Sequence, residues 1–477
     1  MIERITLQMK LLQNRGNSVR NIHLLLLLAV GSVIFLLVPI DCISPGMGYF
    51  LAEKYLTVPC LLFFGSVLTQ QQSAPARRNM LLSSIAVLWF AAAQLQHHLA
   101  QMGIGSFGVF AVVYLLAFPF ASAAEQESRA AGIKWIGTIY VAASLLLVLC
   151  GVMLLLDQVP AALSPGFFMD SGRLNIMWHP NVLACIFMIG IGFTLYFLLQ
   201  AETKWAKVAL AALSVIQLCG MALTNSRTSI LVTSGFLGGT VFFLIWKGGW
   251  KRFLAGAAAG LVVIVTVFSL SGALFDFHTQ TQINRALQQA PIHSESAASE
   301  EETLPPQLQI DDDTGEIRLA GASQQHSLRE DIWTLNNRTY IWKAAIQAVL
   351  DNPAIRLWGT EYVSMEISYR NIAPVGHAHN SWFQTMMSLG LPGLLIALAY
   401  TAIALFRCAV LLFHRSADLS KKVIVLLVLC IMAAGFLEPY LFVGDIFTLF
   451  ANFIFFFLTG YLDAWCRELP GKKSKLL

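Results

Sequence analysis

The chain has 477 residues, of which 57% are hydrophobic and 12% are charged, and its mean hydropathy is +0.66. Soluble proteins carry about 25% charged residues, so this composition excludes a soluble globular protein and predicts an all-α polytopic integral membrane protein. The formal net charge is +4. We expect a lipid bilayer and no nucleic acid among the partners of the chain.

About twelve apolar runs are predicted to cross the membrane as helices, because most have 17 or more residues and a hydrocarbon layer is about 30 Å thick. These runs are residues 22–40, 52–69, 80–96, 103–121, 133–156, 181–200, 206–223, 229–246, 253–275, 383–412, 422–442 and 445–463. No small-residue cleavage site follows the first run, so we interpret it as an uncleaved helix rather than a signal peptide. The long run at 383–412 is expected to be tilted or broken near Pro392.

The runs divide the chain into two membrane domains on either side of one large extracytoplasmic loop. Residues 1–275 contain spans 1–9, residues 276–380 form the loop, and residues 381–477 contain spans 10–12 and a basic cytoplasmic tail. The loop includes an acidic insert at about 288–330. This insert is too polar to bury a core, and we predict that it is disordered.

A helix is predicted in the loop at about 337–351, because apolar residues recur at helical spacing until Asp351-Asn352-Pro353 ends it. Arg338 falls in its first turn, where the partial positive charge of the helix N-terminus disfavours a cation. A nearby anion would remove that penalty. The simpler interpretation is an arginine that is exposed to solvent.

The basic residues predict which side of the membrane each loop faces. With both termini in the cytoplasm, most of the 31 lysines and arginines fall on the cytoplasmic side, and the large loop is extracytoplasmic. Arg173 and Arg227 are exceptions, because they lie in short outer loops where the insertion bias does not place cations. Either they form salt bridges or anchor the chain at the interface, or they bind an anion.

The sequence offers no sign of a cofactor or of a metal site. The eight cysteines show no CxxC spacing, and most lie inside predicted spans as small packing residues. His377 and His379 have the spacing of a metal-binding pair, but no third ligand has convincing spacing. No Walker loop is present, and the short cytoplasmic loops leave no room for a nucleotide-binding domain.

Four polar stretches are predicted to face the same side of the membrane. They are Arg173 with Trp178-His179-Pro180-Asn181, then Ser226-Arg227-Thr228, then Asn337-Arg338-Thr339, and His377-Ala378-His379-Asn380-Ser381. Arginine binds phosphate oxygens bidentately and stays charged, and histidine is suited to proton transfer near neutral pH. The set therefore suits a substrate with a diphosphate group and a hydroxyl that is deprotonated.

A carboxylate is predicted near the same surface, at the outer end of the eleventh span. Glu438 is followed by Pro439. Two interpretations are open for this glutamate: it pairs with one of the arginines, or it is simply exposed.

These stretches resemble the O-antigen ligase and O-antigen polymerase superfamily of bacterial membrane glycosyltransferases. That pattern has an arginine before a His/Asn-Pro-Asn triplet, a Ser-Arg-Thr at a span start, an arginine and tryptophan on a loop helix, and His-Asn followed by Gly-x-Pro-Gly. All four occur here in order: Arg173 with His179-Pro180-Asn181, Ser226-Arg227-Thr228, Arg338 with Trp342, and His379-Asn380 with Gly390-Leu391-Pro392-Gly393. The resemblance covers roughly residues 170–400.

The resemblance implies transfer of a glycan from polyprenyl (undecaprenyl) diphosphate to an acceptor hydroxyl in cell-surface polysaccharide biosynthesis. His379 would be the general base, and Arg173, Arg227 and Arg338 would hold the diphosphate. Asn380, His377, Asn181 and Ser226 would be supporting residues. The protein would lie in the bacterial plasma (inner) membrane, with a flippase and a chain-length regulator as candidate partners.

Two choices stay open at this stage. A ligase and a polymerase share these motifs, so the acceptor is either a lipopolysaccharide core or the next lipid-linked repeat unit. About twelve spans also suit a membrane transporter or a flippase of lipid-linked glycans. Transporters often show repeated halves and charged residues at mid-membrane, whereas this chain shows no repeat and gathers its charges at one face.

Overall fold

The computed structural model describes residues 74–98, 117–124, 126–155, 168–170, 173–175, 180–289, 308–310, 317–319, 338–360, 363–367, 371–375, 377–414, 417–442 and 449–469. The predicted spans at 22–40 and 52–69 lie outside these residues, as does most of the span at 103–121. His179 also lies outside them.

Eight helices in the described part of the chain are long and apolar enough to cross a membrane. They are α7 (Gln126–Leu155), α8 (Pro180–Gln200), α9 (Lys204–Leu223), α10 (Arg227–Ile245), α11 (Trp250–Gln289), α15 (Ser381–Phe413), α16 (Leu419–Leu437) and α17 (Leu449–Glu468). Each coincides with one of the predicted spans from 133–156 onward, and α5 (Ala74–His98) coincides with the run at 80–96. The all-α polytopic membrane class is confirmed, and the total of twelve spans stays a prediction.

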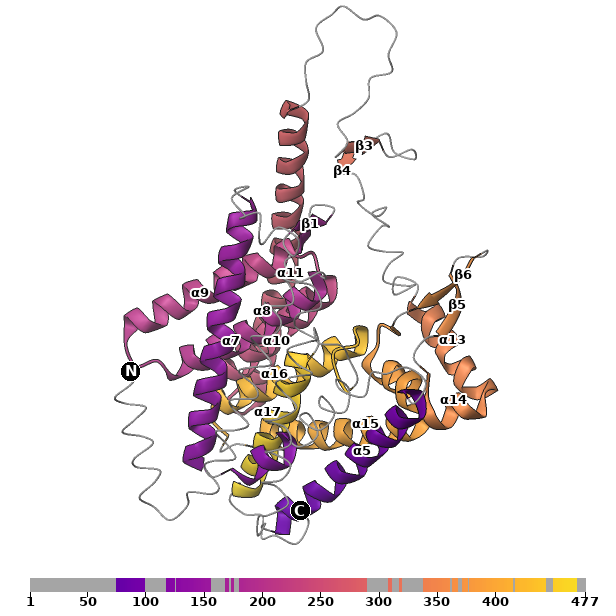
Figure 1. The fold of residues 1–477 in the computed structure, drawn as a ribbon. Helices are drawn as coiled ribbons and strands as arrows, with labels where there is room; N and C mark the ends of the chain where they lie inside the picture. Colours follow the sequence, from indigo (N-terminus) through magenta and orange to yellow (C-terminus); the bar gives the residue numbers. More distant parts are fainter. Residues whose placement is uncertain are drawn as a thin grey trace, which may run out of the picture.

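The other described elements are two short helices and three antiparallel hairpins. The helices are α13 (Arg338–Asp351) and α14 (Pro353–Trp358), and the hairpins are β1 (Phe168–Asp170) with β2 (Arg173–Asn175), β3 (Leu308–Ile310) with β4 (Ile317–Leu319), and β5 (Val363–Ile367) with β6 (Asn371–Val375). The β3–β4 hairpin falls within the acidic insert, whose disorder stays a prediction. α13, α14 and the β5–β6 hairpin lie together beside the start of α15 (Figure 1).

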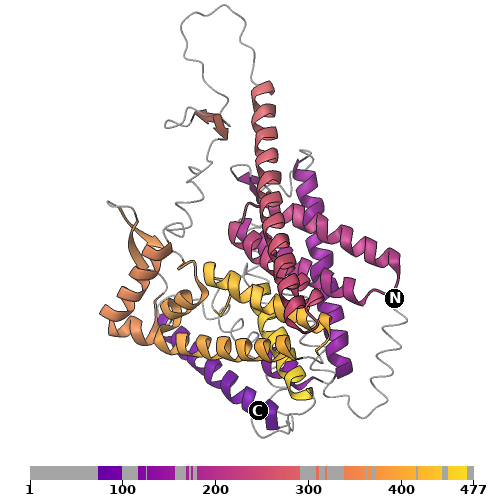
Figure 2. The same ribbon diagram turned by 180° about the vertical axis from the view of Figure 1, so that it is seen from behind.

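The membrane helices differ in what they bury. Every residue of α17 from Leu449 to Cys466 is buried, as expected for a helix that is apolar all round and lies inside a bundle. α8, α10 and α16 pack side by side (Figure 1). By contrast, α11 is mostly exposed along its apolar length, which suits a lipid-facing helix, and its end projects beyond the other helices (Figure 2).

A cluster of charged side chains joins the ends of α7, α15 and α17, and Arg129, Arg407 and Asp463 among them are buried. Arg407 near the end of α15 pairs with Asp463 on α17 at 2.7 Å, and Arg129 on α7 pairs with Glu468. Arg467 also lies 3.6 Å from Asp463. These ion pairs compensate charges that would otherwise be costly to bury, and they lie at the opposite end of α15 from His379.

A break divides α15 at Gly390, as the sequence predicts for this long span near Pro392. Gly390 has φ 70°, which favours glycine, and Pro392 has no backbone N–H. The carbonyls around the break find other donors: Met387 O accepts from Thr360 N, and Leu389 O accepts from Trp89 Nε1 at 3.0 Å. The end of α14 therefore docks against the break.

Replacing Gly390 with alanine tests this junction. A Cβ at Gly390 would lie 2.3 Å from the Leu357 carbonyl oxygen, and its positive φ disfavours alanine. We expect Gly390→Ala to lower the free energy of unfolding by about 2 kcal/mol or more, measured by thermal unfolding in detergent. Gly235→Ala is the matched control, because a Cβ there meets nothing within 4 Å. Equal unfolding temperatures for both variants would contradict the proposed packing.

Candidate active site

The site is built around the carboxylate of Glu438, which follows the last residue of α16. The residue before a proline is disfavoured in helical conformation, and Glu438 before Pro439 is extended, with φ −145° and ψ 153°. The predicted span at 422–442 is therefore too long, because the helix ends at Leu437. Leaving the helix here directs Glu438 toward polar side chains, among which it is only 2% exposed.

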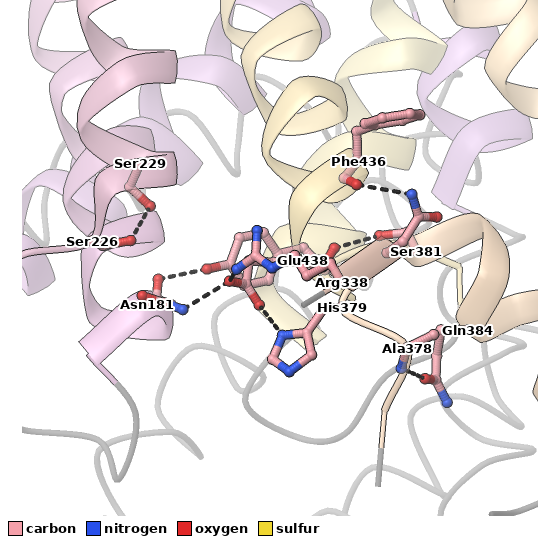
Figure 3. Close-up of polar contacts among 12 residues, drawn as sticks. Asn181, Ser226, Ser229, Arg338, Ala378, His379, Ser381, Gln384, Phe436 and Glu438 are labelled. Carbon is pink, nitrogen blue, oxygen red and sulfur yellow. Dashed lines mark hydrogen bonds and ion pairs between the residues drawn. The ribbon is translucent and has the colours of Figure 1, made fainter. Parts of the chain in front are cut away.

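Three side chains from distant parts of the sequence contact the two oxygens of this carboxylate (Figure 3). Arg338 Nη2 lies 2.6 Å from Oε1, and Asn181 Nδ2 donates to the same oxygen at 2.8 Å. His379 Nδ1 lies 3.4 Å from Oε2. Of the two sequence-based interpretations of Glu438, pairing with an arginine is the one that the structure bears out.

Arg338 is the first residue of α13, where a cation is disfavoured unless an anion lies nearby. Glu438 is that anion, and it leaves the Arg338 side chain only 14% exposed. Trp342, one turn further along α13, donates from Nε1 to the Ala378 carbonyl at 2.9 Å and packs on Phe383 and Phe436. The tryptophan thus fixes the helix that presents the arginine.

Arg173 joins the site through an amide. From β2, its Nε donates to the Thr224 carbonyl at 2.9 Å, and its Nη2 donates to Asn181 Oδ1 at 3.3 Å. Asn181 is the second residue of α8 and donates in turn to Glu438. We call Arg173, Asn181, Arg338, His379 and Glu438 the Glu438 cluster.

His379 lies at the open edge of the cluster. Its side chain is 29% exposed, and its backbone has φ 48°, a left-handed conformation that is uncommon outside glycine. Such strained positions are enriched at functional sites. The ring of His377 lies 4.1 Å from the ring of His379, centroid to centroid, so the two imidazoles are direct neighbours.

Asn380 acts on the backbone next to His379. Its Oδ1 accepts from the Trp382 and Phe383 N–H groups at 2.9 and 3.0 Å and caps α15, and its Nδ2 donates to the Phe436 carbonyl at 2.8 Å. Asn380 therefore supports the site by fixing the backbone beside His379, because these bonds join the start of α15 to the end of α16.

Arg227 lies near the cluster but is more open to solvent. It is the first residue of α10 and is exposed. Its neighbour Ser226 is buried, and the Ser226 hydroxyl donates to Ser229 Oγ at 3.2 Å. The same turn contains Thr224, whose carbonyl binds Arg173. The contacts described above join Arg173, Arg338 and His379, whereas Arg227 lies beside the group at the surface.

Glu438 is the residue that the sequence-based site set omits. The sequence feature that could have identified it is a carboxylate followed by a proline near the end of an apolar run, on the same predicted side of the membrane as the arginines. The described residues contain no group of three His, Cys, Asp or Glu side chains arranged to hold a metal ion.

The helix directions explain why these segments meet. α8, α10 and α15 begin at the cluster, whereas α9 and α16 end there. When successive helices cross a membrane in opposite directions, the end of one helix and the start of the next lie at the same surface. The cluster therefore lies at one end of the bundle rather than at its middle.

Residues 212–398 match the family model described as O-antigen ligase. The match confirms the resemblance to the O-antigen ligase and polymerase superfamily and supports a membrane enzyme of that type. It includes Arg227, Arg338 and His379, and it ends before Glu438. No curated protein matches the chain.

Substituting Asn380 tests its positioning role. Asn380→Ala removes the α15 cap and the bond to Phe436, so we expect the free energy of unfolding to fall by about 1–2 kcal/mol and enzymatic activity per folded molecule to fall as well. Asn352→Ala is the matched control, because Asn352 caps α14 through Ala354 and Ile355 but is exposed. The control is expected to lose stability without losing activity. If Asn380→Ala retained full activity, its role would be capping alone.

Proposed function

We propose that this protein is an inverting glycosyltransferase that moves a glycan from a polyprenyl diphosphate, with undecaprenyl diphosphate as the expected carrier, to an acceptor hydroxyl. The observation that carries the proposal is the convergence of Arg338, His379 and the Arg173–Asn181 pair on Glu438 at one end of the helix bundle. Within the superfamily it resembles, such chemistry builds cell-surface polysaccharide.

His379 is the general base in this proposal. With Nδ1 directed at Glu438, the other ring nitrogen, Nε2, accepts the proton of the acceptor hydroxyl. The hydroxyl oxygen forms a bond to C1 of the donor glycan, and the bond between C1 and the diphosphate oxygen breaks. Its electron pair leaves with the polyprenyl diphosphate, and the configuration at C1 inverts because attack comes from the opposite face.

The arginines stabilise the leaving diphosphate. Arg338 contacts Glu438 through Nη2, so its other guanidinium N–H groups are directed elsewhere and suit a phosphate oxygen. Arg227 is exposed beside the cluster, and Arg173 adds charge from the β2 side. Fixed guanidinium groups supply the positive charge that a metal ion supplies in other phosphate-leaving reactions, so the proposed mechanism uses no metal.

A transporter or flippase of lipid-linked glycans is the alternative function. It is favoured less because the cluster lies at helix ends, whereas substrate sites of secondary transporters lie near the midplane. The products distinguish the two: an enzyme forms a new glycosidic bond, and a flippase moves the lipid-linked glycan unchanged. The product also distinguishes a ligase from a polymerase, because the acceptor is either a lipopolysaccharide core or a second lipid-linked repeat unit.

Substitution of the proposed base and of one arginine tests the mechanism. We expect His379→Ala to lower the transfer rate by about 10²–10⁴-fold, and Arg227→Ala by about 10²–10³-fold. The rate is measured as the glycosidic product that equal amounts of each purified variant form from lipid-linked glycan. The level of each variant in the membrane is checked beforehand. Arg252→Ala is the control, because Arg252 is also exposed and lies at the start of α11. Undiminished transfer in both site variants would overturn the mechanism.

A further inference from the structure

We propose that Glu438 is a positioning residue that couples the arginine grip on the diphosphate to the orientation of the base. This inference rests on the proposed function and adds a role that the family match, which ends at residue 398, does not reach. The carboxylate divides its two oxygens between the two halves of the reaction. Oε1 binds Arg338 on the leaving-group side, and Oε2 faces His379 on the acceptor side.

The backbone around Glu438 is fixed to the start of α15. Ser381 Oγ donates to the Glu438 carbonyl at 2.9 Å and accepts from Leu441 N at 2.9 Å. Ser381 follows directly on His379 and Asn380, and Asn380 binds the Phe436 carbonyl. Two adjacent side chains, Asn380 and Ser381, therefore fix the backbone that carries the carboxylate relative to the backbone that carries the imidazole.

The contacts of Glu438 exceed those that a structural ion pair requires. A buried carboxylate is compensated by one well-placed arginine with additional hydrogen bonds, and Arg338 and Asn181 already supply these at Oε1. Oε2 faces an imidazole at 3.4 Å, a length seen for catalytic hydrogen bonds that tighten when substrate is present. A carboxylate that accepts a hydrogen bond from one ring nitrogen fixes the tautomer of the histidine.

The tautomer decides whether His379 works as a base. When Nδ1–H donates to the Glu438 carboxylate, the lone pair is on Nε2, which faces away from Glu438. When a diphosphate binds Arg338, the carboxylate loses part of its compensating positive charge. Its interaction with the imidazolium that forms during transfer then becomes stronger. Donor binding on one side of Glu438 thereby prepares the base on the other side.

Glu438→Gln separates this role from a structural one. Glutamine has the same shape and its Oε1 still accepts from Arg338 and Asn181, but its NH₂ group donates to His379 Nδ1 and places the proton on Nε2. We expect kcat to fall by about 10²-fold or more, and KM for the lipid-linked donor to change by less than about 3-fold. Glu438→Asp, which retains the charge, is expected to recover part of the loss.

A double-mutant cycle with His379→Ala is the decisive experiment. If Glu438 acts through His379, adding Glu438→Gln to His379→Ala changes the residual rate by less than about 3-fold. Equal fold losses in both backgrounds would overturn the inference, as would a wild-type kcat in Glu438→Gln. Asp463→Asn is the matched control: it removes another buried carboxylate paired with arginines, far from His379, and is expected to lower stability while leaving kcat per folded molecule unchanged.

Failure of this inference is distinguishable from failure of the proposed function. If the wild-type protein forms no glycosidic product, the proposed function fails. If the wild type is active, His379→Ala is impaired and Glu438→Gln is unimpaired, the base survives and only the role of Glu438 is lost. Binding of glycan-free polyprenyl diphosphate gives an independent readout. Its affinity is expected to be as high in Glu438→Gln as in the wild type or higher, because the diphosphate no longer shares Arg338 with a carboxylate.

Discussion

The negative charge of Glu438 is buried, and the geometry of the site follows from the need to compensate it. Moving a carboxylate out of water costs several kcal/mol even after relaxation, and removing one partner of a buried pair is strongly destabilising. Arg338, Asn181 and His379 must therefore converge on this group, although they come from a loop helix, the start of α8 and the start of α15. One carboxylate thus brings together segments that lie more than 200 residues apart in sequence, since Asn181 and Glu438 are separated by 257 positions.

The membrane imposes the second constraint. Backbone polar groups cannot be left unpaired in lipid, so the chain crosses as helices and its irregular segments gather at the surfaces. Arg173, Thr224, His379 and Glu438 all lie at such ends, where a backbone outside helical conformation is tolerated. At the opposite end, the buried side chains of Arg407 and Asp463 are paired with one another. At the first end, a partly exposed histidine directly contacts the buried carboxylate of the ion pair.

The sequence predicts the membrane helices of the described region and the break in α15, because apolar length and the proline at 392 are local signals. It does not predict α14. For Arg338 it leaves two interpretations open, a nearby anion or simple exposure to solvent, because the penalty for a cation at a helix N-terminus is a local signal. That Glu438 is this anion depends on the tertiary structure, which brings the two residues together. The apolar residues Tyr440-Leu441-Phe442 extend the predicted span past Glu438, whereas Pro439 and the bonds from Ser381 turn the chain out of the helix. The burial of Glu438 depends on those long-range contacts, which cannot be predicted from a hydropathy profile.

A structure of the protein with bound polyprenyl diphosphate, determined by electron cryomicroscopy, tests the central claim most directly. The account predicts that the diphosphate contacts Arg338 together with Arg227 or Arg173, and that Nε2 of His379 faces the position of the sugar C1 while Nδ1 remains on Glu438. A diphosphate bound away from these arginines, or a His379 ring turned from both Glu438 and the ligand, would contradict the account.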